Sequence, residues 1–276
     1  MSDVLHSRQQ ILVLRVLSLG VALQCVGLWR TAYVDGTALG STLFMTWGWS
    51  EDAMLAVELG AAWGVLALGA VTLLRPWCAG LMALAGWFAL IAGLAWFQGG
   101  QFGYQYSVLA HATRIGAPLA LAVLAWPGLD AERRREWGVR ILRVAVALTF
   151  ATHGLEALQH HPSFIDYIIT AFRRAGLGIS EPASRVLLTA IGVQDFVLAA
   201  LVLTQRWRAV VGYMVLWGVV TALSRMVHMG TGKWPATLIR SANWAVPLAL
   251  WVAWSGSREQ ASEHEEQGQK RHAVVG

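Results

Sequence analysis

Long apolar runs separated by short polar turns dominate this chain. A helix needs roughly 20 apolar residues to cross the hydrocarbon core of a bilayer. Backbone groups in lipid must be hydrogen-bonded within their own segment, so long runs without alternation predict helices rather than barrel strands. We therefore predict an all-α polytopic membrane protein with eight transmembrane helices, near residues 11–29, 53–74, 77–97, 107–126, 139–158, 184–204, 209–228 and 238–254.

The apolar pattern also repeats along the chain. Three short motifs recur in order at a nearly constant spacing: Arg15 and Arg143 are 128 residues apart, Trp77 and Trp207 130, and Pro118 and Pro247 129. This spacing predicts two tandem four-helix bundle repeats, 1–126 and 139–255, joined by a cytoplasmic linker, 127–138. Four spans is an even number, so both units would enter the membrane in the same orientation, as a parallel repeat.

Lysine and arginine positions predict the orientation, because cytoplasmic loops carry an excess of both. With both termini in the cytoplasm, the outer loops hold Arg173, Arg174 and Lys233. The inner segments then hold ten cations: Arg8, Arg75, Arg133, Arg134, Arg135, Arg206, Arg208, Arg258, Lys270 and Arg271. Residues 256–276 are polar and without pattern, so we expect a disordered cytoplasmic tail.

Composition agrees with a membrane protein. Hydrophobic residues make up 56% of the 276 residues and charged residues 13%, about half of what soluble domains carry. Fifteen tryptophans suit the membrane–water interface. The net charge of +5 does not indicate nucleic-acid binding, because the cations lie in loops between spans. We expect the run 11–29 to be a span rather than a cleavable signal peptide, and Cys25 and Cys78 to be free apolar fillers.

The segment ATHGLEALQHHP, 151–162, is unusually rich in polar groups. Helix positions are about 100° apart, which places His153, Glu156 and His160 on one face within about 60°. Histidine and glutamate on one face can bind a metal or relay protons. His160 and His161 adjoin Pro162 and are expected to be solvated at the outer interface. His153 and Glu156 lie deeper and are candidates for a functional role.

Other ionisable or polar side chains fall in the predicted outer half of the membrane. Such groups usually pair or face water, because a lone ion at the bilayer centre costs roughly 2.5–3.5 kcal/mol. They could line one outward-facing polar pocket shared by both units, or they could snorkel and pair near helix ends. Asp195 is predicted near the middle of a span, where an acid is a functional candidate or a partner for a neighbouring helix. The full set predicted for the pocket is His153, Glu156, Arg225, His228, Arg240, Asn243, His111, Arg114, Glu58 and Asp195.

Cofactor motifs are absent from the sequence. There is no phosphate-binding loop, dinucleotide fingerprint, HExxH or CxxCH, and we predict no metal site. Two histidines could in principle ligate a haem, but the spacing of His111, His153 and His228 does not demand it. The turn between Arg225 and Arg240 could hold an anion or a quinone carbonyl through charge-assisted hydrogen bonds.

Two segments resemble the DoxX-like integral membrane family. VELGAAWGVLALGAVTLLRPWCAGLMALAGWF, 57–88, is similar to that family's second and third helices, which are rich in glycine and leucine and flank a tight basic turn. RVAVALTFATHGLEAL, 143–158, is similar to its first helix, with Arg143, a His153–Gly154 pair and Leu158. The family's usual lysine after His-Gly is missing, and Glu156 and Ala157 stand in that region. Cys25 occupies the place of His153 in the first unit.

This resemblance implies a helical bundle that takes part in membrane redox chemistry, including quinone- or thiosulfate-linked systems. Most relatives have a single four-helix unit, whereas this chain carries two. Three functions therefore stay open. The chain could be a membrane component of a quinone- or sulfur-linked redox system that meets membrane or periplasmic redox proteins. It could be a non-catalytic assembly subunit, or a carrier of small solutes or ions. We expect it in the bacterial inner membrane.

Overall fold

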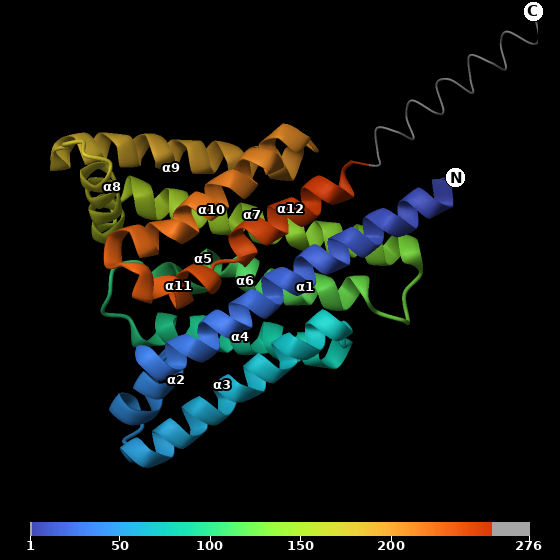
Figure 1. The fold of residues 1–276 in the computed structure, drawn as a ribbon, viewed down its shortest axis with the longest axis horizontal. Helices are drawn as coiled ribbons and strands as arrows, with labels where there is room; N and C mark the ends of the chain where they lie inside the picture. Colours follow the sequence, from blue (N-terminus) through green and yellow to red (C-terminus); the bar gives the residue numbers. More distant parts are fainter. Residues whose placement is uncertain (1, 256–276) are drawn as a thin grey trace, which may run out of the picture.

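A computed structural model describes residues 2–255, and within that range the chain is helical and contains no strand (Figure 1). Seven segments are long and apolar enough to cross a membrane, so the chain is a multi-pass membrane protein. The predicted tail, 256–276, lies outside the described residues. The elements are α1 (Ser2–Val34), α2 (Ala38–Ser41), η1 (Thr42–Thr46), α3 (Glu51–Leu74), α4 (Cys78–Gln98), η2 (Tyr104–Tyr106), α5 (Ser107–Ala110), α6 (Ala112–Leu124), α7 (Ala131–Leu158), α8 (Pro162–Arg174), α9 (Glu181–Thr204), α10 (Arg208–Met229), η3 (Thr231–Lys233), α11 (Trp234–Leu238) and α12 (Ala242–Ala253).

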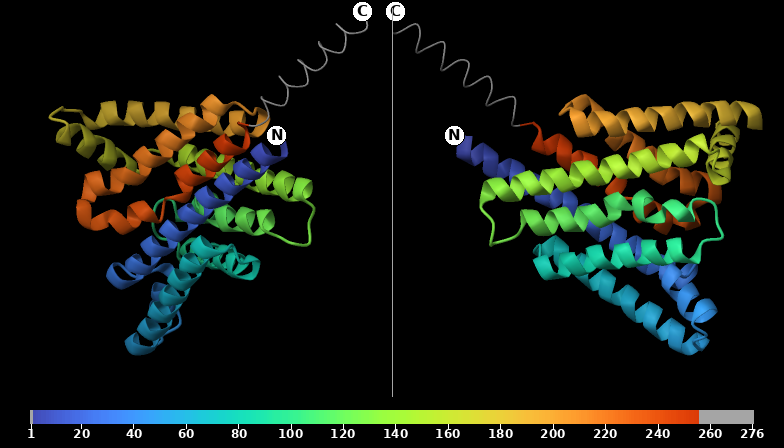
Figure 2. Two further views of the ribbon diagram at one scale, coloured as in Figure 1. Left: turned by 45° about the vertical axis from the view of Figure 1, so that its right-hand side comes forward. Right: turned by 180° about the vertical axis from the view of Figure 1, so that it is seen from behind.

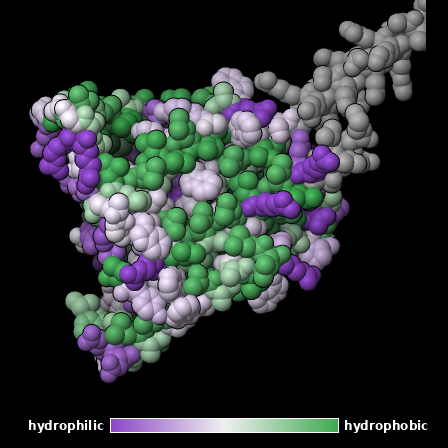
Figure 3. All heavy atoms as spheres, viewed as in Figure 1, coloured by the Kyte–Doolittle hydropathy of each residue, from purple (hydrophilic) through white to green (hydrophobic). Residues whose placement is uncertain are grey.

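Large apolar side chains cover the outside of the bundle, as expected for a surface that faces lipid. Leu74, Val186 and Leu216 are 88%, 72% and 62% exposed. Figure 3 shows a broad hydrophobic face, with hydrophilic residues gathered toward its two ends. Polar ends and an apolar waist are typical of a helical bundle whose long axes run across the bilayer.

The two halves of the chain use corresponding packing partners. Helix α1 packs on α3 and α12, whereas α7 packs on α9 and α6. Helix α4 covers α6, and α10 covers α12. Small residues permit the close approaches: a Cβ added at Gly20 would lie 2.5 Å from Ala245, and one added at Gly116 would lie 2.5 Å from Ala145. Helices α6 and α12 therefore form the centre of the bundle. Each of them packs on both α1 and α7.

The fourth predicted span, 107–126, is interrupted. The chain runs through η2 and α5, turns at His111, and continues as α6. The eighth predicted span, 238–254, does not form one helix either, because α11 ends at Leu238 and α12 begins at Ala242 after a turn at 239–241. Only the 12-residue α12 remains there, too short to count among the seven long helices. Seven of the eight predicted spans therefore correspond to long apolar helices, and the eighth is divided between α11 and α12.

Helix α8 is a further departure from the predicted pattern, which left 159–183 as an outer loop. His161 caps this helix by accepting a hydrogen bond from the backbone N–H of Ser163, and Pro162 occupies its first position. Proline suits that position because its missing N–H would have had no partner there. Figures 1 and 2 show α2, α8 and α11 at one end of the bundle and the N-terminus at the other.

Candidate functional site

A cavity of ≈ 210 Å³ lies among α7, α8, α9, α10 and α12. Its walls are mostly apolar and aromatic, and every lining residue falls between Thr149 and Asn243. The residues that line this cavity therefore all belong to the second predicted unit, and none belongs to the first. Five of the predicted site residues line the cavity: His153, Asp195, Arg225, Arg240 and Asn243.

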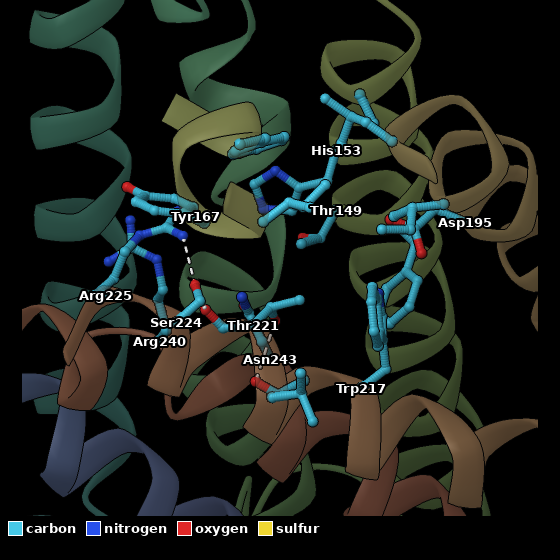
Figure 4. Close-up of a pocket in the computed structure, with 18 of the residues that line it drawn as sticks. Thr149, His153, Tyr167, Asp195, Trp217, Thr221, Ser224, Arg225, Arg240 and Asn243 are labelled. Atoms are coloured by element: carbon cyan, nitrogen blue, oxygen red, sulfur yellow. Dashed lines mark hydrogen bonds between the residues drawn. The ribbon is translucent and has the colours of Figure 1, made fainter. Parts of the chain in front are cut away.

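The polar groups gather at separate ends of this cavity. Figure 4 shows Arg225, Arg240 and Ser224 together at one end, and Asp195 with Trp217 at the other. Arg225 donates a hydrogen bond to the Ser224 hydroxyl at 3.0 Å, and its guanidinium lies 4.2 Å from the ring centroid of Tyr167. Stacking of this kind holds a cation in place by a cation–π interaction. The arrangement offers donors at one end and a carboxyl group at the other.

Glu156 is buried behind His153 and does not line the cavity. Its carboxylate lies 2.8 Å from His153 Nδ1, so it accepts a hydrogen bond from that nitrogen. A carboxylate on Nδ1 fixes the tautomer and leaves Nε2 as the basic nitrogen. Helical spacing predicted this pair correctly, because residues three apart on a helix are neighbours.

His228 also stands behind the wall of the cavity. Its Nδ1 lies 2.9 Å from the hydroxyl of Thr170, and its ring meets Tyr167 edge-on with centroids 5.1 Å apart. His228 therefore positions Tyr167 rather than facing the cavity.

Glu58 lies in the other half of the molecule. Its carboxylate accepts a hydrogen bond from the backbone N–H of Thr37 and fits against Gly40 in α2. The side chain is 4% exposed. Glu58 thus anchors the connection between α1 and α3 and does not belong to the cavity.

His111 and Arg114 flank the break before α6 and are absent from the cavity lining. The acids and arginines of the set could have paired with one another. In the described part of the chain, no ion pair within 4.0 Å joins Glu58 or Glu156 to Arg114, Arg225 or Arg240.

The two histidines at the end of α7 are not solvated as expected. His160 adopts φ +55° and its Nε2 lies 3.1 Å from the Thr189 hydroxyl. His161 stacks on Phe164 with ring centroids 4.6 Å apart. Burial lowers the pKa of His161 below its ordinary value of 6.5, and the nearby Glu156 opposes this effect.

Several lining residues are uncharged and belong to no motif, so inspection of the sequence does not select them. Phe164 and Tyr167 come from α8, and Trp217 and Ser224 from α10. The apolar spacing 164, 165, 168, 169, 172 after a proline could have indicated α8. No group of three or more His, Cys, Asp or Glu side chains within residues 2–255 is placed to hold a metal ion.

No protein-family model, no curated protein and no solved structure matches the chain.

Proposed function

We propose that this chain is a quinone-binding membrane protein that serves a quinone- or sulfur-linked redox system in a bacterial inner membrane. The cavity among α7–α10 and α12 carries this proposal. It combines apolar walls with a few polar groups, which is typical of small-molecule sites. A quinone is a flat apolar ring that partitions into the bilayer and has two carbonyl oxygens on opposite sides.

The two ends of the cavity suit those two oxygens. Toward one end, Arg225 can donate hydrogen bonds, and the amide of Asn243 adds a further donor in the cavity wall; the Ser224 hydroxyl already donates to the carbonyl of Thr221. At the other, Asp195 can donate one when its carboxyl group is protonated. Phe164, Tyr167 and Trp217 supply aromatic faces for the ring between them.

His153 and Glu156 suit the protons that accompany quinone chemistry. A quinone takes up two electrons and two protons to become a quinol. The free Nε2 of His153 can accept a proton from a quinol hydroxyl, and the Glu156 carboxylate stabilises the resulting imidazolium. The electrons would come from or go to a partner redox protein in or beside the membrane.

The wider architecture is part of the same proposal. We propose eight membrane passes in two tandem four-helix units, with both termini cytoplasmic and the last pass made by α11 and α12 together. The corresponding packing partners of α1 and α7, and of α4 and α10, support a tandem repeat. The likeness of 57–88 and 143–158 to the DoxX-like family supports membership of that family.

Quinone binding can be tested on the purified full chain in detergent. We expect a short-tailed ubiquinone or menaquinone analogue to quench tryptophan fluorescence saturably, and organic extraction of the native protein to release quinone. Trp217→Ala should weaken binding about tenfold, since an aromatic contact and its buried area together contribute about 1.4 kcal/mol or more.

Trp87 provides the matched control. It lies 130 residues before Trp217, at the corresponding position of α4, and does not line the cavity. Trp87→Ala should leave the affinity unchanged. Equal quenching in both variants, or no extractable quinone, would contradict the proposal. In the absence of quinone, a partner that co-purifies would instead favour an assembly subunit.

A carrier function is the second candidate, and the interrupted helices favour it. The breaks at His111 and at 239–241 lie about 130 residues apart, at corresponding places in the two halves. Broken helices in corresponding repeats often mark a transported substrate. Uptake of a small solute by reconstituted liposomes, without bound quinone, would support this alternative.

A further inference from the structure

Three arginines near the cavity have no carboxylate partner. Arg114, Arg225 and Arg240 are each half-buried, and the five ion pairs of the described residues involve other side chains. Arg225 and Arg240 line the same cavity, and Arg114 follows Thr113, whose hydroxyl bonds to Asn243 in the cavity wall; these three form the arginine cluster. Glu156, the acid on the neighbouring α7, has its carboxylate bonded to His153. This arginine cluster therefore carries more positive than negative charge.

Most donors of the arginine cluster are unused. A guanidinium has five N–H donors. Arg225 donates to Ser224 at 3.0 Å and Arg240 to the carbonyl of Ala236 at 2.7 Å. No side chain or backbone group of the described residues makes a hydrogen bond to the guanidinium of Arg114. Arg225 and Arg240 both line the cavity, and Figure 4 shows them toward the same end of it.

The two interrupted helices add further positive potential at this place. Helix α12, of 12 residues, begins two residues after Arg240, and α6, of 13 residues, begins two residues before Arg114. Neither helix has a side-chain hydrogen bond at its N-cap. The first N–H groups of both helices are bonded within the described chain, that of Thr113 to the Thr149 hydroxyl and that of Asn243 to the carbonyl of Arg240. The dipole at each helix N-terminus still favours a negative charge.

Asn243 is an independent indication of a ligand. It is only 7% exposed, and its amide oxygen accepts a hydrogen bond from the Thr113 hydroxyl at 2.7 Å. This bond fixes the amide so that its NH₂ group is left to donate, and Asn243 lines the cavity. A buried amide group with unused donors beside two arginines suits an acceptor that the protein itself does not provide.

We propose that the arginine cluster, with Asn243, binds a compact oxyanion such as a phosphate group. Ionised groups within a membrane protein pair with a counter-charge or face water, and here no carboxylate of the described residues pairs with any of the three guanidiniums. Planar guanidiniums match the oxygens of phosphate in a bidentate manner. The group could be free phosphate or the headgroup of an anionic lipid, because the recognised chemistry is the same. This site goes beyond quinone binding, since a quinone is neutral and leaves the excess charge unbalanced.

The test measures anion-dependent stability of the full chain in nanodiscs of phosphatidylcholine. Sodium phosphate is titrated at an ionic strength held constant with sodium chloride, and thermal unfolding is followed. A free-anion site predicts a saturable rise in Tm. Arg240→Gln should weaken the apparent phosphate affinity about tenfold or more, because it removes charge-assisted hydrogen bonds to the anion. Arg240→Lys, which keeps the charge, should retain part of the effect and covers the case in which the glutamine variant does not fold.

A lipid source has a different signature. After purification from membranes that contain phosphatidylglycerol, native mass spectrometry should find that lipid on the wild type and not on Arg240→Gln, while free phosphate has no effect. Arg140→Gln is the control, because Arg140 pairs with Glu136 on the exposed surface, and it should behave as the wild type in both arms. If neither phosphate nor phosphatidylglycerol distinguishes Arg240→Gln from Arg140→Gln, the anion site is refuted. Quenching of tryptophan fluorescence by the quinone analogue, measured on the same samples, reports separately on the proposed function.

Discussion

Helices α3 and α9 are built alike but bury different acids. Each has 24 residues, begins after a capping serine, Ser50 or Ser180, and carries an acid in its first turn. The buried positions of α3 are 58, 62, 65, 69 and 72, and those of α9 include 188, 192, 195, 199 and 202, each 130 residues later. The same helical frame thus recurs in both halves.

The difference lies in which of these positions is polar. Position 58 is a glutamate that anchors α2, whereas its counterpart, Leu188, packs under α8 with Ala157 and Ile165. Position 65 is a valine, whereas its counterpart, Asp195, lines the cavity. Cys25, fully buried against Gly69, likewise stands 128 residues before His153. In the described structure, polar residues of the second half therefore line this cavity at positions where the first half has buried apolar residues.

The largest effect is expected from labelling experiments that test whether the halves share one orientation. In a background without Cys25 and Cys78, Arg75→Cys and Gln205→Cys should react with an impermeant maleimide from one side of the membrane only. Thr46→Cys and Ala175→Cys should react only from the other. All four positions are exposed. If corresponding positions label from opposite sides, the halves do not run parallel.

Removal of the first half's buried acid should destabilise the protein strongly. Glu58→Leu copies the residue of the second half and leaves the N–H of Thr37 without an acceptor. An unsatisfied buried donor costs about 1–3 kcal/mol, so we expect a lower Tm in detergent. Glu51→Leu, at the exposed start of the same helix, should have little effect. A stable Glu58→Leu protein would mean that α2 is held by other contacts.

The reverse exchange in the second half should stabilise the fold and weaken the site. One carboxylate oxygen of Asp195 is buried without a hydrogen bond in the described structure, and Asp195→Val copies Val65. Removing this group should raise the free energy of unfolding by about 1 kcal/mol. The same variant should lower quinone affinity, and Asp195→Asn should recover part of it. A less stable valine variant with full affinity would show that Asp195 is structural.

The smallest effect concerns pH. Burial lowers the pKa of His161 in the folded state, so the unfolded chain takes up the proton more readily. The stability is complete above the ordinary value of 6.5 and falls as the pH drops below it. His161→Asn keeps a capping acceptor for α8 and should flatten the Tm–pH profile in this range. His160→Asn, which suits the left-handed φ of +55°, should leave the profile unchanged.

The amino-acid sequence by itself determined the helical class, the seven long spans and the His153–Glu156 pair. These follow from local physics: apolar length must match the bilayer, and residues three apart on a helix meet. The spacing of Arg15, Trp77 and Pro118 with their counterparts, 128 to 130 residues, also agrees with the spacing of 130 residues between buried positions of α3 and α9.

Only the tertiary structure decided which polar groups meet. Glu58 and Asp195 are both buried acids on similar helices, and nothing in the local sequence distinguishes an anchor for α2 from a residue of the cavity wall. The breaks at His111 and 239–241 and the placement of α8 over α9 and α10 depend on neighbouring helices that satisfy the freed backbone and cover the apolar face. Burial and partnership are properties of the packed bundle, because they require residues more than 100 positions apart, such as Thr113 and Asn243, to come into contact.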